Sequence, residues 1–242
     1  MSDKLTRARQ TLAAAEQIAV LTGAGMSTEA GIPDFRSTTG LYSRRSDYPP
    51  EYLLSINCLD THPELFFDYV RTNLNFQGVQ PDAAYRLLAK LEQRGRVSGI
   101  ITQNIDGLHA AAGSQRVLEA HGSLARFYCT DCGRGADATE QLRPQVPFRC
   151  DCGGLLRPDV VLYGEALPNV DAAFELADDA DALLVLGTSL VVYPIAAIPQ
   201  RCLSLGKPVV IVNRDATGYE HVDGVIELHT SIGDTLPRLF AD

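Results

Sequence analysis

Four of the six cysteines lie in two close pairs whose spacing is typical of a metal site. Cys129 and Cys132 are separated by two residues, and Cys150 and Cys152 by one. Four thiolates complete the tetrahedral shell that zinc adopts in structural sites, and such a closed shell leaves no position for a reactive water. We therefore predict one structural zinc ion. The alternative is four reduced cysteines in a core, but little apolar sequence surrounds them.

A glycine-rich turn near the N-terminus could bind phosphate. The apolar run 18–21 is typical of a buried parallel strand, and Gly23 and Gly25 after it would let backbone N–H groups approach an anion. Ser27 and Thr28 add hydroxyl groups that could cap a helix or donate to phosphate. Position 28 departs from the dinucleotide fingerprint, which has a third glycine there, so a plain tight turn is the alternative.

Three residues that follow this turn favour a ligand site. Asp34, Phe35 and Arg36 would bring a carboxylate, an aromatic ring and a guanidinium to the same place. Phe35 is suited to shield a developing positive charge from water, and Arg36 to bind phosphate or carboxylate groups.

Polar residues also follow two later apolar runs. Asn104 and Asp106 come after the run 97–102, and His121 comes after the run 117–120. The carboxyl ends of parallel strands meet at one edge of a sheet, so we expect these side chains to gather beside the glycine-rich turn. An imidazole titrates near neutral pH and could act as a general base. Taken alone, Asn104 and Asp106 also fit loop capping, and His121 fits a structural histidine.

The segments 22–36 and 102–109 together closely resemble the sirtuins of the bacterial type, and the resemblance runs from about residue 18 to residue 239. It implies an NAD-dependent protein-lysine deacetylase, which transfers the acetyl group from acetyl-lysine to ADP-ribose and releases nicotinamide. NAD would be a cosubstrate, and proteins or peptides carrying acetyl-lysine would be the partners. A protein ADP-ribosyltransferase, a deacylase of longer neutral acyl groups and a nonenzymatic NAD-sensing or zinc-ribbon interaction module are the alternatives.

The resemblance also implies a set of site residues. The catalytic residues would be His121 as the general base and Asn104, and the nicotinamide would contact Phe35, Ile105 and Asp106. The complete set of cofactor contacts would be Ala24, Thr28, Phe35, Arg36, Gln103, Ile105, Asp106, His121, Thr188, Ser189, Asn213 and Ile232. The acyl-lysine peptide would pair with the segment that contains Val160, Tyr163, Gly164 and Glu165.

The same resemblance predicts the acyl group. Sirtuins that prefer succinyl or malonyl lysine carry a Tyr-x-x-Arg pair, and here Phe67 and Val70 occupy those two positions. Tyr69 and Arg71 are two residues apart, so on a helix they would point about 200° away from each other and could not replace the pair. We therefore expect acetyl-lysine to be preferred over succinyl-lysine.

The order of the apolar patterns predicts an α/β fold. Expected strands cover residues 18–21, 97–102, 117–120, 159–163, 182–186, 208–212 and 224–228, and expected helices cover 4–16, 53–75, 81–94, 108–112, 172–177, 195–205 and the C-terminal segment. Alternating strands and helices of these lengths favour a doubly wound, Rossmann-like parallel sheet.

We expect a single sirtuin-type catalytic domain over residues 1–242. Its NAD-binding lobe would comprise about 1–36, 96–122 and 158–242, and its small lobe a helical insertion of about 37–95 and a zinc-binding module of about 123–157.

The composition is that of a globular protein, with 45% hydrophobic and 21% charged residues and a formal charge of −9. The acidic balance argues against a nonspecific nucleic-acid binder and is compatible with a lysine-rich peptide. No apolar run approaches membrane-spanning length and the first residues lack a signal core, so we expect no membrane association and a cytoplasmic location.

Overall fold

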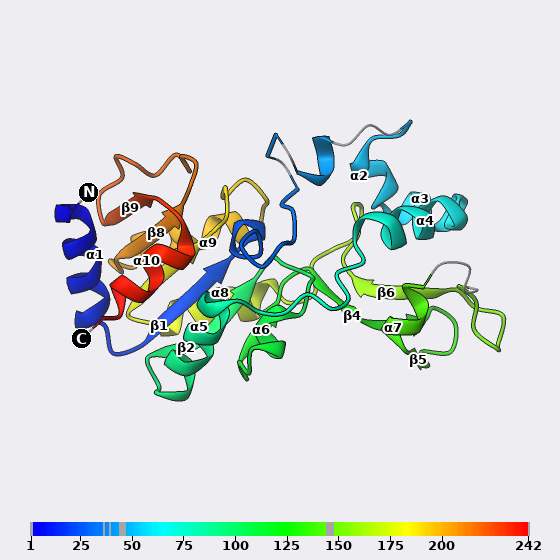
Figure 1. The fold of residues 1–242 in the computed structure, drawn as a ribbon, viewed down its shortest axis with the longest axis horizontal. Helices are drawn as coiled ribbons and strands as arrows, with labels where there is room; N and C mark the ends of the chain where they lie inside the picture. The colour runs from blue at the N-terminus through cyan, green and yellow to red at the C-terminus, as the bar shows by residue number, and fades with distance from the viewer. Residues whose placement is uncertain (1, 36, 39, 44–46, 144–147, 242) are drawn as a thin grey trace.

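The computed structural model describes residues 2–35, 37–38, 40–43, 47–143 and 148–241. A six-stranded parallel sheet forms the larger part of the molecule, in the order β3-β2-β1-β7-β8-β9 (Figure 1). Its strands are β1 Ile18–Thr22, β2 Val97–Thr102, β3 Val117–Glu119, β7 Ala182–Leu186, β8 Val209–Asn213 and β9 Val225–His229. All the pairs in this sheet are parallel, which confirms the predicted α/β fold.

Helices cover both faces of the parallel sheet because alternate strand residues point to opposite sides. Val20 and Leu184 share one apolar cluster with residues of α1 Ser2–Ala14, α5 Ala83–Gln93, α6 Leu108–Ala111 and α10 Ile232–Leu239. Leu21 and Leu183 share a second cluster with residues of α8 Val170–Asp179 and α9 Ile198–Ser204, the latter preceded by the short helix η3 Ile195–Ala197. The sheet is therefore doubly wound.

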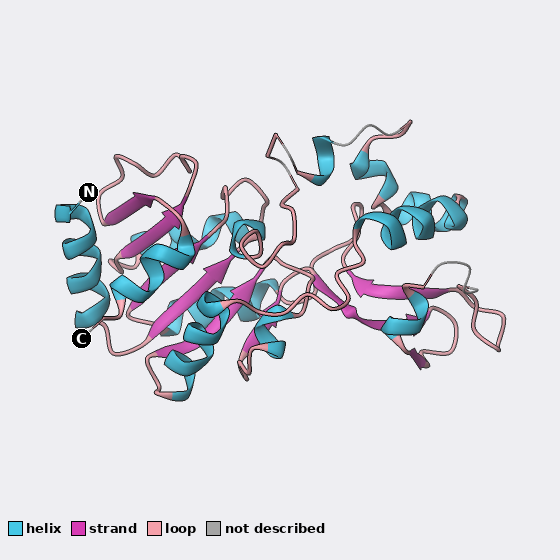
Figure 2. Ribbon diagram, in the orientation of Figure 1, coloured by secondary structure: helices cyan, strands magenta, loops and turns pink. Residues whose placement is uncertain are grey.

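A second, antiparallel sheet lies at the other end of the long axis of the molecule (Figures 1 and 2). It has the order β5-β4-β6, with β4 Gly122–Cys129, β5 Gly135–Ala136 and β6 Leu156–Val160, and α7 Ala138–Gln141 follows β5. The strand expected at 159–163 is therefore misplaced: β6 ends at Val160 and pairs with β4 instead of joining the parallel sheet. Its apolar residues serve the core of this smaller sheet, and an apolar run alone does not reveal which sheet it joins.

The helical insertion is divided more finely than the sequence predicted. In place of one helix over 53–75 the chain forms α2 Pro50–Leu53, α3 Ile56–Thr61 and α4 Pro63–Asn73, with the short helix η2 Leu41–Ser43 before them. The Ser55 hydroxyl caps α3 by accepting the Cys58 N–H, and Pro63 begins α4. Phe66 and Phe67 pack these helices onto Leu124 and Phe127 of β4 in a third apolar cluster. Within the described residues no helix is both long and apolar enough to cross a bilayer.

Candidate active site

The carboxyl ends of β1, β2 and β7 meet at one point of the parallel sheet. The Gly23 N–H donates to Leu186 O at 3.0 Å, and the Gly25 N–H donates to Gly187 O at 2.8 Å. A Cβ atom on Gly23 would lie 2.6 Å from Thr188 Cβ, and one on Gly25 would lie 2.8 Å from Gly187 Cα. The two glycines are thus required because two backbone segments touch here.

The residues after the glycines form turns instead of the helix that Ser27 and Thr28 were expected to cap. The short helix η1 Ala24–Met26 ends at Ser27, and residues 27–31 continue as turns. Ser27 is only 1% exposed, so it cannot donate to a phosphate in solvent as the sequence suggested. The Thr28 hydroxyl donates to Gly25 O at 3.0 Å and stabilises the turn.

Ser27 instead lies at the centre of a buried hydrogen-bond network. Its Oγ donates to Asp106 Oδ2 at 2.6 Å and accepts from Asn104 Nδ2 at 2.9 Å. The single hydroxyl proton of Ser27 is then committed to Asp106, so Tyr85, whose hydroxyl is 2.7 Å away, must donate to Ser27. Asn104 Nδ2 also donates to Gly23 O at 3.0 Å. The network fixes the side chains of both predicted residues, Asn104 and Asp106.

Burial raises the pKa of Asp106, and hydrogen bonds from Ser27 and from the Leu108 N–H oppose that rise. The Leu108 N–H donates to Asp106 Oδ1 at 2.9 Å, although Gly107 and not Asp106 occupies the N-cap position of the following short helix. Burial is also the main cause that raises the pKa of Tyr85, which keeps its hydroxyl a neutral donor. Sequence reasoning missed Ser27 and Tyr85 as parts of this network.

His121 connects the two sheets, since it lies between the end of β3 and the start of β4. Its Nδ1 is 2.9 Å from Gln103 O. A carbonyl oxygen can only accept, so Nδ1 carries the proton, and in the neutral ring Nε2 carries the lone pair. This is the tautomer that a general base at Nε2 requires. Thr188 Oγ1 donates to Gln103 Oε1 at 2.9 Å, which holds Gln103 from the side of β7.

A second histidine in the same region is unsuited to catalysis. His109 is 2% exposed, and its Nε2 lies 3.0 Å from Thr22 Oγ1. Its ring contacts Tyr85 edge-on, with centroids 4.6 Å apart. Burial lowers the pKa of His109 to about 3, so this imidazole stays neutral and serves as a structural residue.

Phe35 and Ile105 lie where the parallel sheet meets the small sheet, since both pack against the third apolar cluster. The Phe35 ring contacts Tyr42 edge-on, with centroids 5.6 Å apart. Asp34 Oδ1 accepts the Ser37 N–H at 2.8 Å and so shapes the turn beside them. The predicted phosphate-binding residue Arg36 lies outside the described residues.

The remaining predicted cofactor residues follow β7, β8 and β9. Ser189 is exposed after β7, and Asn213 ends β8 with its Nδ2 donating to Asp215 O at 2.8 Å. Ile232 begins α10 but is 6% exposed and belongs to the first apolar cluster. A ligand would therefore meet Ile232 mainly through its backbone.

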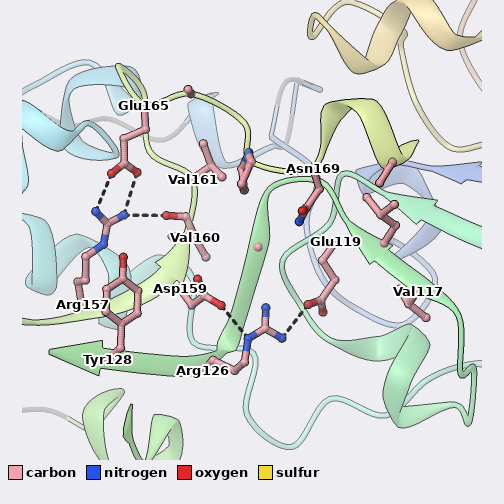
Figure 3. Close-up of a pocket in the computed structure, with 15 residues that line it drawn as sticks. Val117, Glu119, Arg126, Tyr128, Arg157, Asp159, Val160, Val161, Glu165 and Asn169 are labelled. Atoms are coloured by element: carbon pink, nitrogen blue, oxygen red, sulfur yellow. Dashed lines mark hydrogen bonds and ion pairs between the residues drawn. The ribbon is translucent and has the colours of Figure 1, made fainter. Parts of the chain in front are cut away.

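The predicted peptide segment is held by a partly buried ion pair. Arg157, which is 5% exposed, donates to Glu165 Oε1 at 2.7 Å and to Oε2 at 2.9 Å (Figure 3). Glu165 Oε2 also accepts the Leu162 N–H at 2.8 Å. The carboxylate thus fixes its own loop and is not directed at a peptide. Tyr163 is 41% exposed, and its backbone pairs with the residues on either side of Ser55.

A cavity of about 730 Å³ opens beside this segment, between the ends of β3, β4 and β6 and the start of α8 (Figure 3). Val160 and Glu165 line it. Arg126 also lines it and forms ion pairs with Glu119 and Asp159, each at 2.7 Å. The charged side chains of this cavity are therefore paired with one another.

The four clustered cysteines have the geometry expected of a metal site. All four Sγ atoms lie within 4.8 Å of one another, with Cys129 and Cys152 3.4 Å apart and Cys132 and Cys150 3.8 Å apart. Hydrogen bonds from Gly133 N to Cys129 O and from Cys150 N to Gly154 O form the two knuckles. The cysteines are free thiols, so all four can act as ligands, and the site fits a structural zinc ion.

Comparison with known proteins agrees with this site. Residues 23–194 match the Sir2 family model. A protein of Cutibacterium acnes named NAD-dependent protein deacetylase is 50% identical over 219 residues, which are 88% of each chain. A protein of the same name from Clostridium acetobutylicum is 41% identical over 240 residues, 97% of each chain. The solved structure of a substituted Sir2 with deacetylated p53 peptide and 3′-O-acetyl ADP-ribose superposes with a TM-score of 0.88 at 34% identity, covering 97% of this chain and 96% of the other.

Proposed function

The chain belongs to the Sir2 family and is an NAD-dependent protein deacetylase, and from its geometry we propose which residues carry the reaction. The observation that carries the proposal is the orientation of His121. Its Nδ1–H donates to Gln103 O, so Nε2 carries the lone pair of the neutral ring and would be the atom that removes a proton from a ribose hydroxyl.

NAD would lie at the edge of the sheet where the glycine-rich turn is. Gln103 Nε2 is buried and has no hydrogen-bond partner among the described residues, as expected where a ligand group is to be bound. Backbone N–H groups of the turn and Thr28 would lie near the phosphates, and Thr188, Ser189, Asn213 and the Ile232 backbone near the adenosine. When bound, NAD supplies nicotinamide as a leaving group and ADP-ribose as the acetyl acceptor.

The buried network around Ser27 would hold the nicotinamide end. Asp106 and Ile105 would bind the carboxamide, and Asn104 would order the ribose and a water. Phe35, at the junction of the two sheets, would exclude bulk water from the reacting carbon. Arg36 completes the proposed set, although it lies outside the described residues.

The substrate would be an acetyl-lysine segment that pairs with the backbone around Val160, Tyr163 and Gly164. Pairing through the backbone gives affinity without requiring a particular sequence. The parallel-sheet lobe, about 1–36, 96–122 and 158–242, would bind NAD, and the small lobe would close over the substrate. The four cysteines would bind a structural zinc ion that stabilises the small lobe and takes no part in the reaction. We place the protein in the cytoplasm, because a site of four thiolates needs reduced cysteines.

The test is product analysis by mass spectrometry with an acetyl-lysine peptide and NAD. We expect free lysine, nicotinamide and O-acetyl-ADP-ribose in equal amounts. Peptide that gains ADP-ribose would instead indicate a protein ADP-ribosyltransferase. A faster reaction on peptides with longer neutral acyl groups would indicate a deacylase of those groups.

The proposed base is tested by His121→Ala, which should lower kcat by about 10²–10⁴-fold while NAD still binds. The matched control is His221→Ala, an exposed histidine that should leave turnover unchanged. Wild-type turnover of His121→Ala at saturating NAD would remove this residue from the mechanism.

A further inference from the structure

A buried carboxylate on the edge strand β9 has no role in the proposed reaction. Ile226 and Leu228 of this strand pack into the first apolar cluster, so Glu227 between them points to the opposite face. Its register neighbour on β8 is Ile211, which belongs to the second apolar cluster. Glu227 is only 3% exposed. A charged side chain therefore occupies a position where its surroundings favour an apolar one.

Only one of the two oxygens of this carboxylate accepts hydrogen bonds from the described residues. Glu227 Oε1 accepts from the backbone N–H and from Oγ1 of Thr217, each at 3.0 Å. Glu227 Oε2 is buried and has no hydrogen-bond partner within the described residues. An ionised carboxylate in such a place is costly unless a positive charge compensates it.

Two further ligand groups lie near this carboxylate. His229 lies two positions along β9, on the same side of the strand as Glu227, and Glu220 comes from the connection between β8 and β9. One ligand atom from each of the three residues lies within 4.8 Å of the other two. His229 Nδ1 is 3.9 Å from Glu227 Oε1, which is too long for a hydrogen bond. The three groups therefore converge without a hydrogen bond between them.

We propose that Glu220, Glu227 and His229 bind a divalent transition-metal ion of the manganese or zinc type. Two carboxylates and a neutral imidazole balance a charge of +2, and mixed oxygen and nitrogen ligands suit these ions. An ion pair between His229 and Glu227 is the competing explanation, but His229 lies near Oε1 at 3.9 Å and would leave the buried Oε2 without a partner in the described part of the chain. The His229 side chain is 40% exposed, which gives an ion access from solvent.

This site is separate from the four cysteines, because β9 and the antiparallel sheet lie at opposite ends of the molecule (Figure 1). It is close to the adenosine end of the proposed NAD site, since His229 pairs in register with Asn213. A bound ion would tie the β8–β9 connection to the edge of the sheet. The proposal rests on these three side chains and not on the deacetylase assignment.

The test uses full-length, zinc-loaded protein titrated with Mn²⁺ alone, with free Mn²⁺ followed by electron paramagnetic resonance. We expect one Mn²⁺ per chain, and at least a tenfold weaker affinity for Glu227→Gln and for His229→Ala. Glu175→Gln, which removes an exposed carboxylate of α8, should bind like the wild type.

A parallel arm measures zinc per chain after equilibrium dialysis against Zn²⁺ alone, where wild type should hold one more ion than Glu227→Gln. If Glu227→Gln does not fold, as judged by circular dichroism, Glu220→Gln replaces it in both arms. If the wild type binds neither ion, the proposal is overturned, and the cluster is then only an ion pair between His229 and Glu227. Equal binding by the wild type and the ligand variants would overturn it as well.

Discussion

Replacing Ser27 by alanine should destabilise the protein more than the loss of one hydroxyl would suggest. The substitution leaves the Tyr85 hydroxyl and one N–H of Asn104 without their acceptor, and both residues are buried. Each buried donor that loses its acceptor costs about 1–3 kcal/mol. Because two donors are affected, Ser27→Ala should lower the free energy of unfolding by about 2–6 kcal/mol. Tyr85→Phe removes only one donor from a hydroxyl that keeps two other bonds, and should cost about 1 kcal/mol.

The two substitutions should not be additive. In the Ser27→Ala background the Tyr85 hydroxyl is already unpaired, so removing it should cost nothing or restore stability. Urea unfolding of the wild type, both single variants and the double variant gives the coupling energy, which we expect to be about 1–3 kcal/mol. Tyr52→Phe is the control, because the Tyr52 hydroxyl bonds to His62 at the surface. Additive costs would refute the inferred Tyr85–Ser27 hydrogen bond.

Three other predictions follow from the site. Cys129→Ala should lose the zinc ion and destabilise the small lobe, as metal analysis and thermal unfolding would show; metal-free wild-type protein, purified without chelators, would contradict this. An acetyl peptide should be deacylated far faster than its succinyl counterpart, because Phe67 leaves the acyl carboxylate unpaired at a cost of a few kcal/mol; equal kcat/KM values would contradict it. Hydrogen bonding to Arg157 lowers the pKa of Glu165 in the folded protein. The Glu165 carboxylate therefore adds to the free energy of unfolding above its unfolded pKa of about 4.3, and this stabilisation is lost as the pH falls through the lower folded pKa. The difference in unfolding free energy between wild type and Glu165→Gln should shrink over that acid range, and a constant difference would contradict the prediction.

The parallel sheet could be predicted because its strands are short apolar runs that are buried on both faces, which is the pattern a doubly wound sheet imposes. The strand at Leu156–Val160 could not be assigned to its sheet, because the same apolar residues suit either one. The break between α3 and α4 was readable in principle, since Pro63 disfavours continuation of a preceding helix.

The network around Ser27 could not be found from local patterns, because its bonds to Tyr85 and Asp106 join residues 58 and 79 positions apart. One signal was nevertheless present. Tyr85 shares the apolar face of α5 with Leu88, and a buried tyrosine hydroxyl normally requires a partner. The cysteine site could be found from a local pattern, since the spacing of its four ligands lies within a single module.

The two anchors of His121 also determine how the molecule would respond to bending between its lobes. The ring is held by Gln103 O, which follows β2, whereas the backbone carbonyl of His121 accepts the Val161 N–H at the end of β6. If the antiparallel sheet rotated about the crossing from β3 to β4, the imidazole would stay with the parallel sheet while the peptide segment travelled with the smaller one. With such a rotation the proposed base would keep its alignment with NAD, and only the acyl-lysine would be brought to it and withdrawn.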